Sequence, residues 1–152
     1  MNGIQLLDAY EKDRKTYPNM AAFLPRYRQF LQAWTKQMAL YPNVTAIDEL
    51  NGDKTAISPQ IRQLTIHFSK PMDASKGMSI YCGNAGMAHF PPLDVPACRY
   101  TADGKTFIMP FKKGATLNPN WDYTFIMKGK RFQSRDEYPL RQKVVFFKTA
   151  AT

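Results

Sequence analysis

The sequence is poor in the residues that build metal sites, disulfide networks and nucleophilic centres. Its 152 residues include two cysteines, Cys82 and Cys98, and two histidines, His67 and His89. The cysteines form no CxxC pair and are too few for a disulfide framework, which excludes the common zinc ribbons and thioredoxin-like folds. One bridge between Cys82 and Cys98 and two free thiols are both compatible with this spacing.

Long apolar runs are also absent. No uninterrupted stretch approaches the roughly 18 residues that a membrane-spanning helix needs. Residues 1–15 mix acids and bases and contain no apolar h-region, so we expect no signal peptide in this chain. The protein is then either cytoplasmic or the trimmed portion of an exported one.

Motifs that carry catalysis are missing as well. Neither histidine lies in HExxH or HxH spacing, and no glycine-rich phosphate loop occurs. His67 alternates with apolar strand residues, so we expect it at the surface, and His89 is the only conceivable partner for a cysteine nucleophile. The adjacent acids at 48–49 and 136–137 flank turns and are expected in solvent. The sequence therefore predicts a non-enzyme with no catalytic residues, no metal and no cofactor.

What the chain does have is apolar material and positive charge. Apolar residues make up 44% of it and aromatic residues 13%, enough for a folded core. The net charge of +9 divides as +3 over residues 1–40, zero over 41–111 and +6 over 112–152. Most of the excess positive charge thus belongs to the last quarter of the chain.

The first forty residues favour a helical hairpin. Apolar side chains in the second half of this segment follow one another at spacings of three and four, as on one face of a helix. They are Met20, Leu24, Tyr27, Leu31, Trp34, Met38 and Tyr41. We expect this helix to begin near Pro25, a shorter one over residues 4–15 to precede it, and the hairpin to pack on an edge or end of the following domain.

After Pro42 the apolar period changes from 3.6 to 2, which indicates strands. Alternating runs occur at 61–68, 78–82, 106–111, 123–127 and 144–148, separated by clusters of Gly, Pro, Asn and Asp. The pair Asp103-Gly104 predicts a hairpin that joins Arg99–Tyr100 to residues 105–109. The pattern is typical of an antiparallel β-sandwich, giving an α+β chain overall.

Three stretches of this second part resemble bacterial Ig-like domains of the surface-layer-protein type. Residues 66–73, which include FSKPMD, resemble the strand-and-turn signature of these domains. Residues 117–123 match their L-x-P-x-x-x-Y corner, and residues 144–149 match their closing strand. The resemblance covers residues 43–149, and the long Gly/Pro-rich stretch 83–96 departs from it. It implies an Ig-like β-sandwich over 43–152, with residues 1–42 as a hairpin that ends a preceding domain.

The resemblance also assigns structural roles. Phe68, Pro71 and Met72 belong to the strand-and-turn signature, and Tyr123 stands where a tyrosine corner pins an arch between two sheets. We therefore expect Tyr123 to bond to a backbone group a few residues upstream.

In function, the resemblance implies a non-catalytic accessory or spacer module of an exported bacterial protein, in the periplasm or at the cell surface. Such modules often follow a hydrolase or peptidase domain, so an alternative is the C-terminal part of a larger hydrolase. Another domain of the same polypeptide is then one expected partner.

The basic last quarter supports a second alternative, a polyanion- or carbohydrate-binding module over residues 112–143. Lys128, Lys130, Arg131 and Arg135 fall in one predicted loop around Phe132, and basic groups interleaved with an aromatic suit polyanions. Trp121 is a candidate platform for a sugar ring. We expect an anionic polysaccharide rather than nucleic acid as the ligand if the protein is exported.

Overall fold

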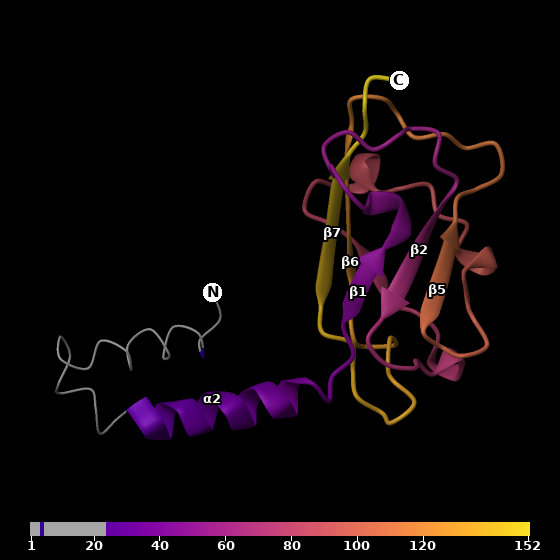
Figure 1. Ribbon diagram of the computed structural model, residues 1–152. Helices are drawn as coiled ribbons and strands as arrows, with labels where there is room; N and C mark the ends of the chain where they lie inside the picture. The colour runs from indigo at the N-terminus through magenta and orange to yellow at the C-terminus, as the bar shows by residue number, and fades with distance from the viewer. Residues whose placement is uncertain (1–3, 5–23) are drawn as a thin grey trace, which may run out of the picture. The chain divides into compact units, whose positions relative to one another are not determined.

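The computed structural model describes residue 4 and residues 24–152 of the chain (Figure 1). Contacts between Cα atoms divide the chain into two units, Met1–Leu40 and Tyr41–Thr152. The helix predicted over residues 4–15 lies outside the described residues, apart from Ile4.

The described part of the first unit is one helix, α2 (Leu24–Met38). Pro25 stands in its first turn, where a missing N–H costs no hydrogen bond, and this agrees with the predicted start. The predicted apolar stripe is only partly buried within the chain. Leu24 is buried, whereas Tyr27 and Trp34 are 40% and 50% exposed.

The second unit contains two antiparallel sheets. The first has the strand order β1-β2-β5-β4, formed by β1 (Val44–Ile47), β2 (Gln63–Phe68), β5 (Thr106–Pro110) and β4 (Arg99–Tyr100). The second has the order β3-β6-β7, formed by β3 (Ile80–Cys82), β6 (Asp122–Met127) and β7 (Lys143–Lys148). The predicted mainly β architecture is therefore confirmed.

The core lies between the two sheets and follows the period of two in the sequence. Leu64, Ile66 and Phe68 of β2 are buried, as the alternation predicts. The other sheet contributes Tyr123, Phe125, Met127, Val145 and Phe147. The alternating inward-facing residues of both sheets form one continuous core, which holds the sandwich together.

Five of the strands and the β4–β5 hairpin lie where the sequence predicts them, with Tyr100 opposite Phe107 in the hairpin. Strand β1 was not predicted. Its four residues are interrupted by a register shift between Val44 and Ala46, so the alternation is too short to recognise.

Candidate functional site

The signature turn at Pro71 and Met72 is held by two other turns of the sandwich. The backbone N–H of Met72 donates to the Gly104 carbonyl at 2.8 Å, and the N–H of Arg135 donates to the Pro71 carbonyl at 3.0 Å. Met72 is fully buried, while Phe68 ends the adjacent strand with its ring in the core. These residues lock the 70–73, 101–106 and 133–138 turns together, which is a structural arrangement.

Tyr123 lies at the start of β6 and is buried. Its ring stacks on Phe147 at a centroid distance of 5.3 Å, and its hydroxyl oxygen accepts a hydrogen bond of 2.8 Å from the backbone N–H of Asn118. Asn118 stands five residues upstream in the Leu117–Pro119 loop. The phenol therefore ties that loop to the start of the strand, as in a tyrosine corner.

Three of the four predicted basic residues lie near strand β3. The Lys128 ammonium sits 4.8 Å from the centre of the Tyr81 ring, within range of a cation–π interaction. Lys130 and Arg131 line a groove of about 350 Å³ together with Tyr81 and Ile80. Lys128, Lys130 and Arg131 therefore form, with Tyr81, a basic rim beside strand β3.

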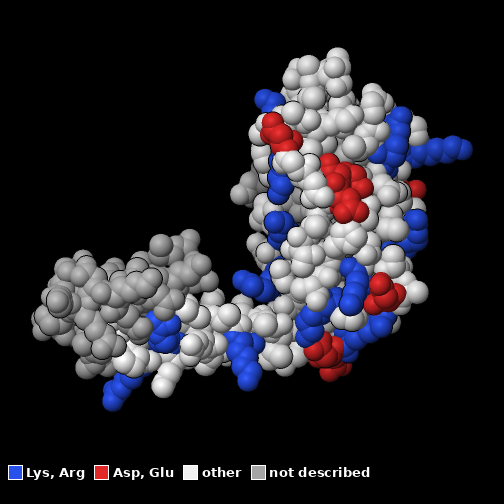
Figure 2. Space-filling model, in the orientation of Figure 1, with Lys and Arg blue, Asp and Glu red and all other residues white. Residues whose placement is uncertain are grey.

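Arg135, the fourth predicted basic residue, is not part of this basic rim. Its guanidinium donates to the Ala102 carbonyl at 2.9 Å. Hydrogen bonds from Ser75 and Thr101 are the main causes that lower the pKa of Asp73 and Asp103, and the charge of Arg135 adds a smaller effect. This cation is partly neutralised by nearby acids. Figure 2 shows the same mixing more widely, with Lys and Arg side chains scattered over the visible face and Asp and Glu between them.

Phe132, the aromatic residue expected among these bases, is not available to a ligand. Its side chain is fully buried and packs against Phe68 and Phe107, with centroid distances of 6.0 and 5.4 Å. The expectation that Phe132 interleaves with the basic residues at a binding surface is wrong, because its ring packs in the core. A hydrophobic residue flanked by bases gives no sequence signal that separates these two outcomes.

Trp121 lies at the far end of β6 from the basic rim. Residues 121 and 128 span a six-residue strand, which separates them by roughly 20 Å. One face of the Trp121 ring stacks on His89 at 4.7 Å, and its indole N–H donates to the Ala88 carbonyl at 2.9 Å. The structure therefore does not bring Trp121 and the basic residues into one site.

His89 is engaged with Trp121 and not with a thiol. Its Nδ1 lies 2.7 Å from the Asp122 carbonyl oxygen. Cys82 and Cys98 are both free, and the Cys98 thiol donates to the Asp94 carbonyl at 3.4 Å. Burial, reinforced by the negative charge of Asp94, raises the pKa of Cys98 to about 11. A thiol with so high a pKa is a poor nucleophile at neutral pH.

The sequence predicts that the acids at 48–49 lie in solvent, but both are engaged in hydrogen bonds. Asp48 accepts from His67 Nε2 at 2.9 Å, and the other ring nitrogen of His67 lies 3.2 Å from the Thr106 hydroxyl. The Glu49 carboxylate accepts from the backbone N–H and the hydroxyl of Thr65. Both acids therefore tie the 3-10 turn Asp48–Leu50 to the face of the first sheet, and His67 is a cross-strand link.

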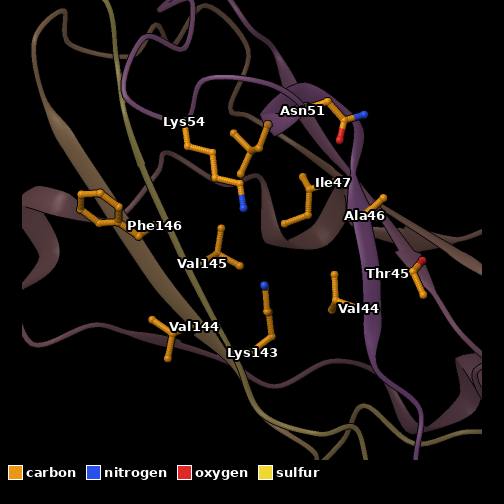
Figure 3. A pocket seen from close by; sticks show the side chains of 11 residues that line it. Val44, Thr45, Ala46, Ile47, Asn51, Lys54, Lys143, Val144, Val145 and Phe146 are labelled. Carbon is orange, nitrogen blue, oxygen red and sulfur yellow. The ribbon is translucent and has the colours of Figure 1, made fainter. Parts of the chain in front are cut away.

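A groove of about 400 Å³ lies between β1 and β7, the neighbouring edges of the two sheets (Figure 3). Its apolar lining comes from side chains that include Val44, Ala46, Ile47, Leu50 and Val145. Lys54 and Lys143 also line it, and Figure 3 shows both ammonium groups directed into the space between the strands. This groove could not be predicted from the sequence, because strand β1 was not predicted.

Within the described residues, no helix is long and apolar enough to cross a membrane. No group of three or more His, Cys, Asp or Glu side chains among residues 4 and 24–152 is placed to hold a metal ion.

No protein-family model matches the sequence, and no curated protein matches it. Among solved structures, the surface layer protein SbsC, domains 1–6, is similar over 86% of this chain and 16% of its own, with a TM-score of 0.50 and 18% identity. The N-terminal part of the bacterial S-layer protein SbsC matches 85% of this chain and 28% of its own, at a TM-score of 0.48 and 20% identity. The chain thus spans about a sixth to a quarter of these proteins, and the likeness concerns the fold.

Proposed function

We propose that this chain is a non-catalytic Ig-like module of an exported bacterial surface protein, where it acts as a spacer or interaction domain. The observation that carries the proposal is the sandwich fold, which is similar to part of the surface layer protein SbsC. The structural use of the chemically versatile groups supports it. His67 and His89 are engaged in fold-stabilising contacts, and the Cys98 thiol is held protonated.

The division into a helical segment, residues 1–42, and a sandwich, residues 43–152, is part of the same proposal. On this view the helical segment ends a preceding domain. The exposed Tyr27 and Trp34 of α2 are consistent with a face that contacts another part of a longer polypeptide.

The location is tested by epitope-tagging the full-length protein in the bacterium that encodes it and treating intact cells with protease. We expect the tag in the extracytoplasmic fraction and cleavage without cell lysis. A tag that is recovered with cytoplasmic proteins and is protected in intact cells would contradict the proposal. The coding sequence upstream of Met1 provides an independent check, since an exported protein requires a leader.

A second candidate function, binding of an anionic polysaccharide, is favoured by the basic rim. Lys128 lies over the exposed Tyr81 ring, and Lys130 and Arg131 line the groove beside it. We expect retention on heparin that weakens steeply with salt. The double variant Lys130→Glu/Arg131→Glu should elute at lower salt than Lys112→Glu/Lys113→Glu, which makes the same charge change on an exposed loop. Equal elution of the two variants would remove the rim as the binding surface.

A further inference from the structure

The four edge strands of the sandwich differ in how well they are protected. Edge strands expose backbone groups that can pair with another chain, and proteins protect them by shortness, bulges or cover. β3 and β4 have three and two residues, and β1 contains a register shift. β7 has six residues in an unbroken register with β6. β7 is therefore the edge best suited to accept another strand.

On the side away from β6, backbone groups at both ends of β7 are hydrogen-bonded to other segments, whereas those in the middle of the strand are not. At one end Arg141 donates to the Pro42 carbonyl at 2.9 Å. At the other, Lys148 donates to the Lys54 carbonyl at 2.7 Å and accepts from Ile57 at 3.0 Å, so Lys148 directs both groups away from β6. Alternate residues of a strand direct their backbone groups to the same side. The N–H and C=O of Val144 and Phe146 therefore face the opening between β1 and β7.

These four backbone groups have no hydrogen-bond partner among the described residues. The side chains beside them are apolar and accessible, with Val144 56% and Phe146 52% exposed on the outer face of the sheet. An added strand would place alternate side chains beside Val144 and Phe146 and the intervening ones in the groove.

The groove favours a negatively charged side chain of the added strand, because two lysines line it. Lys54, from the 51–57 loop, and Lys143, from β7, direct their ammonium groups into it (Figure 3). Within the described part of the chain, no carboxylate lies within ion-pair distance of either lysine. A carboxylate that enters the groove can accept charge-assisted hydrogen bonds from both.

We propose that the opening between β1 and β7 binds a short extended peptide segment with an acidic side chain between two apolar ones. The segment pairs with Val144 and Phe146 by β-augmentation, its acid enters the groove between Lys54 and Lys143, and its apolar side chains cover Val144 and Phe146. A second copy of this chain is a poorer occupant, because joining two β7 edges would bring Lys54, Lys143 and Lys148 of both copies together in a protein of net charge +9. Binding at this opening does not require export of the protein.

The test uses the full 152-residue chain labelled with ¹⁵N and a capped pentapeptide of alternating valine and glutamate. We expect chemical-shift changes centred on the amides of Val144 and Phe146, together with slower hydrogen exchange of these amides. The same peptide with lysine in place of glutamate should bind at least tenfold more weakly, since it loses the charge-assisted contacts.

Three variants separate the backbone and charge contributions. Phe146→Pro removes an N–H that faces the opening and not β6, so the fold should persist while binding is lost. Lys143→Glu should weaken binding at least tenfold, whereas Lys113→Glu, the same change on an exposed loop, should leave it within about twofold.

Equal binding of the two peptides, chemical-shift changes centred away from both β7 and the residues that line the groove, or unchanged affinity of Lys143→Glu would each overturn the proposal. So would a dimer of the free chain in sedimentation experiments that Phe146→Pro dissociates, because that result assigns the edge to a second copy.

Discussion

Tyr123 is a residue whose hydroxyl group can be tested separately from its ring. The Tyr123→Phe substitution keeps the stacking on Phe147 but leaves the Asn118 N–H without its acceptor. We expect the free energy of unfolding to fall by about 1 kcal/mol, the usual cost of one lost hydrogen bond. Denaturant unfolding measures this, with Tyr81→Phe, which alters a phenol on an exposed ring, as the control. An unchanged midpoint for Tyr123→Phe would show that the corner contributes nothing to stability.

Cys98 allows a second test at the residue scale. Burial and Asp94 raise its pKa from 9.0 to about 11, so its alkylation rate in a Cys82→Ser background should rise through about pH 11 and not pH 9. Iodoacetamide labelling across pH 8–12 measures the profile, and the urea-unfolded protein serves as the control with its midpoint near 9. Because the folded pKa is raised, the contribution of this thiol to stability is complete below about pH 9 and is lost as the pH rises through 11.

Among the structural elements, the β4–β5 turn depends on a glycine at position 104. Its φ of +71° suits glycine, and a Cβ there would lie 2.5 Å from the Met72 carbonyl oxygen. We expect Gly104→Ala to destabilise the sandwich by about 2–4 kcal/mol from backbone strain and the displaced 70–73 turn. Gly114→Ala is the matched control, since Gly114 has a φ of +79° and open space around it, and should cost only about 1 kcal/mol. Thermal or urea unfolding distinguishes the two, and equal losses would contradict the role of the close contact.

Sequence patterns predicted the strands that lie in runs of five or more residues between turn clusters, including β3, which itself has only three residues. β2 and β6 alternate in sequence, β7 is a run of four apolar residues between two lysines, and the Asp103-Gly104 turn has its own chemistry. β1 lacks both signals, since four residues interrupted by a bulge give no clear period. The candidate sites were less predictable for a related reason. The position of Phe132 in the core and the groove between β1 and β7 both arise from contacts between segments far apart in the sequence.

Acid should destabilise the whole molecule through its turns. Asp53, Asp73, Asp103 and Asp136 have pKa values below the usual 3.8, because neighbouring side chains donate hydrogen bonds to their carboxylates. At Asp136 the main donor is Lys70, followed by Ser134. Their contribution to stability is present above about pH 3.8 and is lost as the pH falls through the lower folded values. We expect the unfolding midpoint to be flat from pH 7 to 5 and to drop below about pH 4.

The pKa of single carboxyl groups can be followed by NMR titration. Ser75→Ala removes the hydroxyl that donates to Asp73 at 2.6 Å and should raise the pKa of Asp73 toward 3.8. Thr101→Ala should do the same for Asp103 and leave Asp73 unchanged. A common shift of both groups in either variant would indicate a global effect of the substitution.

The positions of the two ends of the sandwich determine how its strands are loaded under tension. Its chain enters at Pro42, hydrogen-bonded to Arg141 before β7 begins, and leaves after Ala150, hydrogen-bonded to Ile57 beyond the end of β7. Tension applied through the two ends therefore pulls β1 along β2 and β7 along β6 in the direction of the strands. Ladder hydrogen bonds run across the strands, so such a load shears many of them together and does not open them one at a time. A unit loaded in this way resists extension in a chain under tension, whatever binds at its surface.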